Sequence, residues 1–277
     1  MSKAVYVVGG GVFGQVIAAK LRTEGHQVTV FDRREKEAGS PPSGGHLKPS
    51  WLTAIPSKEL TKSLETLDSL YGIQKLDCEF GLPPLTKHME LLRVDIGQVL
   101  SGTTHDANVT AVGDGWLDAE IGTGISSSVL RYQGTIIVAA GIWCTELLPQ
   151  FKYHLTGKKG ISWVFHGGEP VSNLIRPWAP YKQIVRTYHG PGKTWIGDGS
   201  AIIPKNWDEQ RERNIFDRVI DYAPPNNTEL VKQRGIRPYM TNGCQQVASR
   251  LWLATGGAKS GMALAGCYAN KLAEVLA

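Results

Sequence analysis

Cysteine is scarce in this sequence, and its few positions are far apart. The four cysteines are Cys78, Cys144, Cys244 and Cys267. None belongs to a C-x-x-C pair, and none has a histidine at the spacing that zinc sites show. The pattern argues against a disulfide framework and against a structural metal site, so we expect no bound metal.

Long apolar runs are also missing. No segment approaches the roughly 20 apolar residues that a membrane-spanning helix needs. The first apolar residues do not make a signal peptide, because Gln15, Lys20 and Arg22 follow too soon and no small-residue cleavage site appears. We therefore expect a cytoplasmic protein, or one of the host cytoplasm if a phage encodes it, with no membrane partner.

Neither sign of charge dominates the chain. Lys and Arg number 30 and Asp and Glu 25, which gives a net charge of +5, and the basic residues are dispersed. This balance is compatible with a polyanionic substrate such as DNA or RNA but does not indicate one. Glycine, in contrast, is abundant at 32 residues, which points to tight turns and to close approaches of the backbone to a ligand.

The first 32 residues have the pattern of a strand, a glycine turn, a helix and a second strand. Residues 3–8 have the composition of a buried strand, residues 12–24 carry apolar side chains at helical spacing up to Gly25, and residues 26–32 alternate. This order is the first unit of a Rossmann-like sheet and predicts an α/β fold.

A G-x-G-x-x-G sequence, Gly9 to Gly14, joins the first strand to the helix. The first glycine permits the tight turn, the second lets a pyrophosphate approach the backbone, and the third lets the helix pack on the strand. The helix then offers unpaired N–H groups and partial positive charge to the phosphates. Asp32 ends the second strand, where a carboxylate can bind the adenosine ribose and repel a 2′-phosphate, although Arg33 and Arg34 follow it. The sequence predicts a dinucleotide site without separating FAD from NAD.

Segments typical of a nucleotide-binding sheet recur in the middle and near the end of the chain, with other material between them. We expect two interleaved domains, because one continuous domain followed by another would not give this order. The other predicted elements are helices over 57–71, around 207–221 and over 261–276, strands over 135–140 and 251–254, a small meander over 108–140, and short strands over 73–100 that Pro83, Pro84 and Gly97 interrupt.

Five segments, in order and across nearly the whole chain, carry a resemblance to a known family. They are the fingerprint through Asp32, the small-residue loop 43–49, the apolar strand 137–143, the Gly-Ile-Arg-Pro segment 235–241 and the glycine turn 254–262. Together they resemble the D-amino-acid oxidase superfamily, in particular its glycine oxidase and sarcosine oxidase branch.

The resemblance implies non-covalent FAD in a Rossmann-like FAD-binding domain of the D-amino-acid oxidase type, interleaved with a reduced mixed-sheet substrate domain. Residues 1–72, 106–148 and 236–277 would form the FAD-binding domain, and residues 73–105 and 149–235 the substrate domain. The implied cofactor-binding residues are Gly9, Gly11, Val12, Phe13, Gly14, Asp32, Arg33, Gly44, Gly45, His46, Leu47, Val109, Ala140, Gly141, Trp143, Arg237, Gly257, Ala258, Lys259, Ser260, Gly261 and Met262.

The same resemblance supplies the candidate catalytic residues. Arg237 matches the arginine that forms a bidentate pair with the substrate carboxylate. His46 lies near the flavin ring by resemblance and is a candidate for tuning the amine or the flavin; a solvated loop histidine is the alternative. Lys259 stands where glycine oxidases have arginine. Arg186 and Tyr188 belong to a segment that replaces the family's YxxPR strand, so their substrate contacts are less defined.

The implied reaction is oxidation of a C–N bond next to a carboxylate in a small amine or amino acid. Hydride passes to the flavin, the imine hydrolyses, and oxygen reoxidises the flavin. A flavin dehydrogenase with another electron acceptor and a non-catalytic dinucleotide-binding protein are the alternatives. The oligomeric state is not indicated.

Within the first class, the glycine-like group is either free or attached to a nucleobase. Two kinds of enzyme act on a group attached to a nucleobase. One is the oxidase domain of the tRNA wobble-uridine modification enzyme, and the other is the bacteriophage oxidases of amino-acid-decorated thymine, such as glycyl-thymine in phage DNA. Exposed tryptophans would suit base stacking, whereas buried ones would be core or domain-interface residues. The tryptophans concerned are Trp163, Trp178, Trp195 and Trp207.

Overall fold

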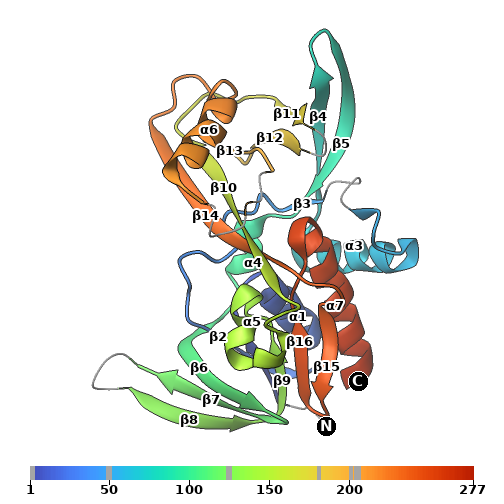
Figure 1. The fold of residues 1–277 in the computed structure, drawn as a ribbon. Coiled ribbons are helices and arrows are strands. Elements are labelled where there is room, and N and C mark those ends of the chain that lie inside the picture. The colour runs from blue at the N-terminus through green and yellow to red at the C-terminus, as the bar shows by residue number, and fades with distance from the viewer. Residues whose placement is uncertain (1–3, 48–51, 123–126, 180–181, 200–201, 203–206) are drawn as a thin grey trace.

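The computed structural model describes residues 4–47, 52–122, 127–179, 182–199, 202 and 207–277, with the backbone alone at position 259. The described strands form two sheets of eight strands each. Figure 1 shows one sheet with helices α1 and α7 in the lower half of the molecule and the other sheet in the upper half. The predicted α/β class with a Rossmann-like unit is confirmed.

The first sheet has a parallel centre and antiparallel flanks. The N-terminal strand β1 lies between β2 and β9, and it is parallel to both. Strand β16 extends the parallel part on the β9 side, and β6 pairs with β2 on the other side. In spatial order the strands are β15 (Cys244–Ala248), β16 (Leu251–Ala254), β9 (Thr135–Val138), β1 (Ala4–Val8), β2 (Gln27–Asp32), β6 (His105–Gly113), β7 (Trp116–Ile121) and β8 (Ser128–Gln133).

Three helices pack together on one face of this sheet. They are α1 (Val12–Thr23), α3 (Ser57–Tyr71) and α7 (Gly261–Leu276). Their apolar faces meet in one buried cluster with the inward side chains of β1, because residues three and four apart share a side of a helix. Helix α1 ends just before Gly25, whose φ of 84° is a left-handed conformation that glycine adopts without strain.

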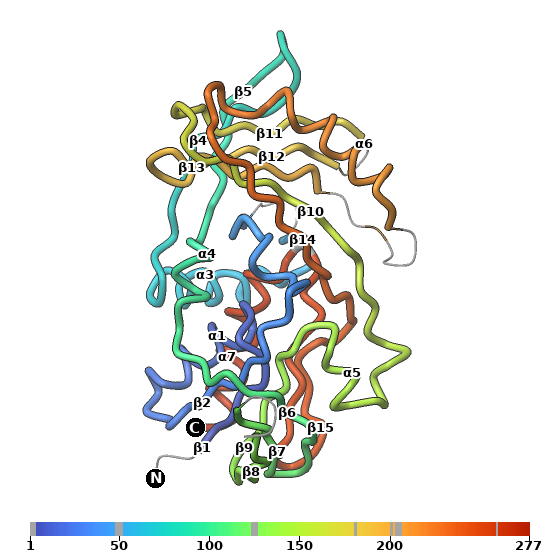
Figure 2. Tube along the Cα trace, turned by 90° about the vertical axis from the view of Figure 1, so that its left-hand side faces the viewer, coloured from blue at the N-terminus to red at the C-terminus, as the bar shows by residue number. Residues whose placement is uncertain are grey.

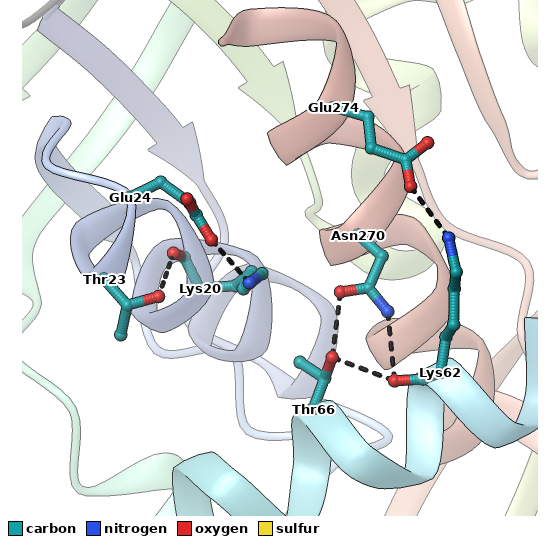
Figure 3. A network of polar contacts seen from close by, with 7 residues as sticks. All are labelled: Lys20, Thr23, Glu24, Lys62, Thr66, Asn270 and Glu274. Carbon is teal, nitrogen blue, oxygen red and sulfur yellow. Dashed lines mark hydrogen bonds and ion pairs between the residues drawn. The ribbon is translucent and has the colours of Figure 1, made fainter.

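Polar contacts join the outer sides of the same helices (Figure 3). The Thr66 hydroxyl donates to Asn270 Oδ1 at 2.8 Å, Asn270 Nδ2 donates to the Lys62 carbonyl at 3.2 Å, and Lys62 Nζ lies 3.3 Å from Glu274. A further pair, Lys20 with Glu24, lies within α1. Exposed pairs of this kind contribute about 0–1 kcal/mol each, so the apolar cluster rather than this network holds the helices together.

The second sheet is mixed and borders the first through two long antiparallel strands, β10 (Thr156–His166) and β14 (Glu229–Tyr239). They pair along their whole length, with His166 opposite Glu229 at one end and Thr156 opposite Tyr239 at the other. Both views show these strands running between the two halves (Figure 2). In spatial order the strands are β14 (Glu229–Tyr239), β10 (Thr156–His166), β13 (Lys193–Gly197), β12 (Lys182–Tyr188), β11 (Asn173–Ala179), β4 (Gln74–Leu82), β5 (Leu85–Arg93) and β3 (His46–Leu47).

One further helix and several short helical segments connect the strands. Helix α6 (Glu209–Ile220) packs on the second sheet through Ile215 and Val219. The segments are α4 (Ile96–Leu100), η2 (Gly141–Trp143), α5 (Cys144–Leu147), η3 (Pro149–Phe151), α6 (Glu209–Ile220) and η5 (Ala258–Ser260). Within the described ranges, no helix combines the length and apolar character that crossing a membrane demands.

The helices predicted over 57–71 and 261–276 are confirmed, as are the N-terminal unit and the strand at 251–254. The prediction for 73–100 was wrong. Strands β4 and β5 form one long hairpin, and Pro83 and Pro84 lie in the turn between them. Gly97 lies in helix α4, because the Asp95 carboxylate accepts hydrogen bonds from the Gly97 and Gln98 N–H groups and caps that helix.

The predicted domain boundaries remain a proposal. Strand β3 lies in the range 1–72 but belongs to the second sheet, and α4 lies in the range 73–105 but packs against α1. The proposal that best fits the sheets therefore places residues 46–47 with the substrate part and residues 96–100 with the FAD-binding part.

Candidate cofactor and substrate site

A cavity of about 780 Å³ lies where the carboxyl ends of the parallel strands meet the second sheet. In open α/β sheets the ligand sites lie at this edge, and ligand cavities measure roughly 300–1,000 Å³. The glycine turn after β1, the loop 38–44 and the closing turn before α7 line one part of the cavity. Residues 100–104, parts of β6 and the segment that follows β9 line another part, and residues of β12, β13 and β14 line the side toward the second sheet.

The glycine turn after β1 is too tight for side chains. Gly9 has a φ of 107°, and a Cβ there would lie 2.6 Å from the Ala139 carbonyl oxygen. A Cβ on Gly14 would overlap the carbonyl oxygen of Gly9, so α1 can approach β1 only with glycine at position 14. Gly11 is less crowded, since its nearest neighbour is the Ser40 hydroxyl oxygen at 2.9 Å. The first and third glycines thus shape the turn, and Gly11 faces the cavity.

The N-terminus of α1 opens into the cavity beside loop 38–44. The Val12 N–H donates to the Ser40 hydroxyl at 3.0 Å, and Val12 and Ser40 both line the cavity. The other N–H groups of a first helical turn lack partners within the helix, which favours a phosphate there. Ser40 was not predicted from the sequence, because a serine in a Gly/Pro/Ser-rich loop has no distinguishing pattern.

Asp32 lies at the end of β2 against the glycine turn. A Cβ on Gly10 would lie 2.6 Å from its Oδ2, and its Oδ1 accepts the Arg34 N–H at 3.1 Å. The neighbouring Arg33 is paired with Glu35 and Glu146, both at 2.7 Å, and the hydrogen bond that Arg33 donates to Glu146 raises the pKa of Arg33. Because two carboxylates engage Arg33, this end of the cavity favours a ribose diol over a 2′-phosphate.

The closing turn brings the C-terminal part of the chain to the same cavity. Gly256 has a φ of 88°, and a Cβ on Gly257 would lie 2.5 Å from Gly261 Cα and 2.6 Å from the Phe13 ring. The Thr255 hydroxyl donates to the Gly141 carbonyl at 3.0 Å and ties this turn to the segment after β9. Glycine-rich backbone and the start of α7 therefore form a second cradle beside the first, next to Phe13 of α1.

Arg237 projects from β14 into the cavity. Burial lowers its pKa, while a hydrogen bond with the Tyr239 side chain and the charge of Asp198 act in the opposite direction. Asp198 is fully buried and also lies 2.9 Å from Arg218 Nη2 on α6. The negative charge of Asp198 thus acts on two guanidinium groups, those of Arg237 and Arg218. Sequence reasoning missed Asp198, which lacks a motif of its own, and gave no role to Tyr239, although Tyr239 lies in the segment 235–241.

His46 is buried at the cavity wall with 8% of its surface exposed. Its ring lies against Trp195 with a centroid distance of 4.8 Å, and a side chain at Gly44 would overlap it. Burial lowers the pKa of His46 to about 3, and the nearby His189 and Arg93 act in the same direction. The solvated loop histidine considered as an alternative is excluded, because the imidazole is enclosed and uncharged near neutral pH.

Arg186 and Tyr188 do not reach the cavity, so the structure gives no support to their predicted catalytic roles. Successive side chains of a strand point to opposite faces, and β12 turns Gln183 and Val185 to the cavity. Arg186 instead donates to the carbonyls of Ser172 and Tyr222, both at 3.0 Å.

The cavity brings together most of the other predicted residues, which come from segments far apart in the sequence. Gly14 and Gly45 act through tight backbone contacts, with a Cβ on Gly45 overlapping the Val94 carbonyl, and Leu47 is part of the core. Lys48, Pro49 and the Lys259 side chain lie outside the described residues, and Ser260 lies in the closing turn. The predicted residues that line the cavity are Gly9, Gly11, Val12, Phe13, Asp32, Arg33, Gly44, His46, Val109, Ala140, Gly141, Trp143, Arg237, Gly257, Ala258, Gly261 and Met262.

The four tryptophans considered for base stacking are not a free aromatic surface. Trp163 is 2% exposed and Trp195 is 9% exposed. Trp178 and Trp207 are partly buried against the cluster of the second sheet and α6. Trp195 alone among them lines the cavity, and its indole N–H donates to the Pro42 carbonyl at 3.3 Å.

Comparisons with known proteins agree with this geometry. Residues 97–275 match the DAO family, described as FAD dependent oxidoreductase, and residues 7–44 match the NAD(P)-binding Rossmann-like domain. A putative flavin-containing monooxygenase, FMO GS-OX-like 11, from Arabidopsis thaliana is 37% identical over 71 residues, which is 26% of this chain. That match spans 39% of the relative, and the match to FMO GS-OX-like 4 spans 15%, so the similarity concerns only a part of these proteins.

Solved structures share the whole fold. Glycine oxidase from Bacillus cereus ATCC 14579 superposes with a TM-score of 0.74 at 14% identity, covering 99% of this chain and 97% of its own. Iminodiacetate oxidase from Chelativorans sp. BNC1 has a TM-score of 0.71 at 16% identity, with coverage of 98% and 95%. L-proline dehydrogenase from P. horikoshii has a TM-score of 0.72 at 12% identity, with coverage of 99% and 93%. At these identities the likeness establishes the fold.

Proposed function

Because this chain belongs to the DAO family of FAD-dependent oxidoreductases, we propose that it oxidises the C–N bond of a glycine-like amine that carries a carboxylate. The observation that supports this substrate class is Arg237, whose guanidinium lies at the wall of the same cavity as the dinucleotide fingerprint. A planar guanidinium binds a carboxylate through two parallel hydrogen bonds, which fixes the orientation of a small substrate.

The residues around the cavity suit FAD. We propose that the α1 N-terminus and Gly11 face the pyrophosphate, that Asp32 binds the adenosine ribose, and that the closing turn at Gly257 and the start of α7 face the ring system. These are places where a Cβ would collide or where N–H groups lack helical partners. FAD, when bound, accepts the hydride, and we propose oxygen as the final electron acceptor and non-covalent binding of the cofactor.

The protein's own contribution is then positioning. Arg237, which is hydrogen-bonded with the Tyr239 side chain, orients the substrate carboxylate and thereby the neighbouring carbon. The amine must lose its ammonium proton before its carbon can give up hydride, and the enclosed wall around His46 and Trp195 excludes water from that step. The imine product hydrolyses to a carbonyl compound and a free amine.

Anaerobic mixing with amines tests this proposal. We expect the flavin absorbance of the purified protein to bleach with glycine or sarcosine, and peroxide to appear when oxygen is admitted. Bleaching without peroxide would identify a dehydrogenase with another electron acceptor. A flavin that no amine bleaches would contradict the proposal and favour a non-catalytic flavoprotein. Propylamine, which has no carboxylate for Arg237, is the matched control and should bleach the flavin far more slowly.

A glycine-like group attached to a nucleobase is the second candidate substrate. The net charge of +5 is compatible with it, whereas the burial of Trp163 and Trp195 removes the stacking surface that would have supported it. For a polymer substrate, we expect activity to fall steeply between low and moderate salt, because phosphate contacts release counterions. Activity on free glycine should change little.

The comparison needs one enzyme, glycyl-modified DNA, free glycine and a salt series. A preference for the polymer together with its steeper salt response would favour the nucleobase-borne substrate, because remote binding energy then positions the reacting group. An equal salt response, or preference for the free amino acid, would leave a small-molecule oxidase.

A further inference from the structure

Behind His46, a buried chain of hydrogen bonds leads away from the cavity. His46 Nε2 lies 3.0 Å from the Thr187 hydroxyl, and the same hydroxyl lies 2.8 Å from His189 Nε2. Thr187 is fully buried, His46 nearly so, and His189 half-buried. The three side chains come from β3, from β12 and from the residue after β12, so the second sheet holds them in line.

The chemistry of Thr187 fixes how these bonds are arranged. A hydroxyl has one hydrogen, so it can donate to one imidazole and must accept from the other. When both bonds form between neutral rings, one histidine therefore carries its proton on Nε2 and the other presents a bare Nε2. His46 Nδ1 makes no hydrogen bond to a described residue, and His46 is one of the residues that line the cavity.

The chain ends near the protein surface. His189 follows β12 at the turn that leads to β13. Its backbone N–H donates to the Lys193 carbonyl at 2.8 Å. Its charged neighbours are Arg93 from β5 and Lys193, which lower its pKa together with burial, and Asp95, which acts in the opposite direction. Arg93 also faces His46, and its Nη1 donates to the Tyr188 carbonyl at 3.3 Å.

We propose that His46, Thr187 and His189 form a proton relay that carries the ammonium proton of the bound substrate from the cavity to the surface. This proposal rests on the proposed amine oxidation, since an alkyl ammonium with a pKa of about 10 arrives protonated at neutral pH.

The relay works by moving protons within hydrogen bonds that already exist. The ammonium proton passes to His46 Nδ1 as the Nε2 proton of His46 passes to the Thr187 oxygen. The Thr187 proton passes to His189 Nε2, and His189 releases its Nδ1 proton to solvent. Three N–H or O–H bonds form inside the relay and three break, no electrons are transferred, and the substrate is left as the neutral amine.

A transfer through the relay suits this site better than storage of the proton on one histidine. Burial and the positive charge of Arg93 oppose an imidazolium at both histidines, and Lys193 adds to this at His189. The pKa of each histidine is thereby lowered to about 3. Neutral imidazoles can nevertheless accept on one nitrogen and donate from the other. The cationic neighbours therefore favour passage of the proton over its retention.

Thr187→Val removes the hydroxyl at nearly constant volume and tests the relay, with flavin reduction followed anaerobically against pH. At neutral pH we expect reduction to slow by about 100-fold or more, the range for lost proton-transfer catalysis. Above pH of about 10, where the amine arrives neutral, the variant should approach the wild-type rate. Thr187→Ser keeps the hydroxyl and should restore the wild-type profile. Thr194→Val, at another buried threonine of the same sheet, is the matched control and should behave as wild type.

A second measurement uses no substrate. Nitrogen NMR of the histidine rings should show one Nε2–H and one bare Nε2 for His46 and His189, with both signals changed together in Thr187→Val and restored in Thr187→Ser. A valine variant whose rate is reduced equally at every pH, or unchanged ring signals, would overturn the relay and leave amine oxidation standing. If no amine reduces the wild-type flavin, the proposed function fails and the relay fails with it, even where the ring signals are as expected.

Discussion

Replacing Arg237 with alanine is expected to leave FAD bound while kcat/KM for a carboxylate-bearing amine falls by about two to four orders of magnitude. Loss of one partner of a buried charge pair costs about 3–5 kcal/mol, and about 1.36 kcal/mol corresponds to a factor of ten in rate. Most of the effect should appear in the substrate concentration needed for half-maximal flavin reduction, because Arg237 binds the part of the substrate that does not react.

Two controls separate a binding role from a folding role. Arg237→Lys should recover part of the loss, since it keeps the charge but not the paired donors of the guanidinium. Arg211→Ala, at an exposed arginine of α6 that pairs with Asp208, should leave the kinetics unchanged. If Arg237→Ala retains wild-type values for glycine and sarcosine, the carboxylate is bound elsewhere.

Gly14→Ala is expected to yield a protein without flavin. The added Cβ would overlap the carbonyl oxygen of Gly9 and approach the Gly9 carbonyl carbon to 3.0 Å. Both atoms belong to backbone, so α1 must move away from β1 and take its first turn out of the cavity. The ratio of flavin to protein absorbance measures the loss. FAD released from acid-treated wild type into the supernatant gives the reference and tests non-covalent binding.

Gly97→Ala is the matched control for this substitution. Gly97 lies inside α4, and the nearest atom to an added Cβ is the Asp95 Oδ1 at 3.1 Å, at the end of a side chain. Alanine inside a helix is favoured over glycine by roughly 0.5–1 kcal/mol, so this variant should keep its flavin. Stoichiometric FAD in Gly14→Ala would contradict the prediction, because it would show that α1 can shift away from β1 without losing the cofactor site.

The parts of the fold that local sequence determines could be predicted. The helix Ser57–Tyr71 repeats leucine at helical spacing, and the glycine turn at Gly9 to Gly14 contains its whole pattern within six residues. The hairpin of β4 and β5 was missed because Pro83 and Pro84 suggested broken strands, whereas they occupy the turn. Gly97 was interpreted as a residue that interrupts a strand. The role of Asp95 as the N-cap of helix α4 can be recognised only once a helix is assumed there.

The site was predictable where one segment carries its own chemistry and not where distant segments meet. His46 and Thr187 are 141 positions apart, and their contact exists only through the pairing of β3 with β5 and the order of the second sheet. The choice between Thr187 and its neighbours Arg186 and Tyr188 depends on which face of β12 the cavity takes. The sequence of a strand alone does not show which of its faces lines the cavity, because a shift of the register by one residue exchanges the two faces.

The position of β1 in the middle of its sheet bears on how the chain folds during synthesis. β1 can pair with β2 early, because β2 follows it closely in the sequence. Its other neighbour, β9, pairs in turn with β16 near the end of the chain, and α1 packs on α7, which follows β16. Until residues 251–276 leave the ribosome, the nascent chain presents an open parallel edge and an uncovered apolar helix face, both of which promote aggregation. Contacts so distant in sequence also form slowly. The dinucleotide-binding half, although begun first, is therefore finished only after translation has passed α7.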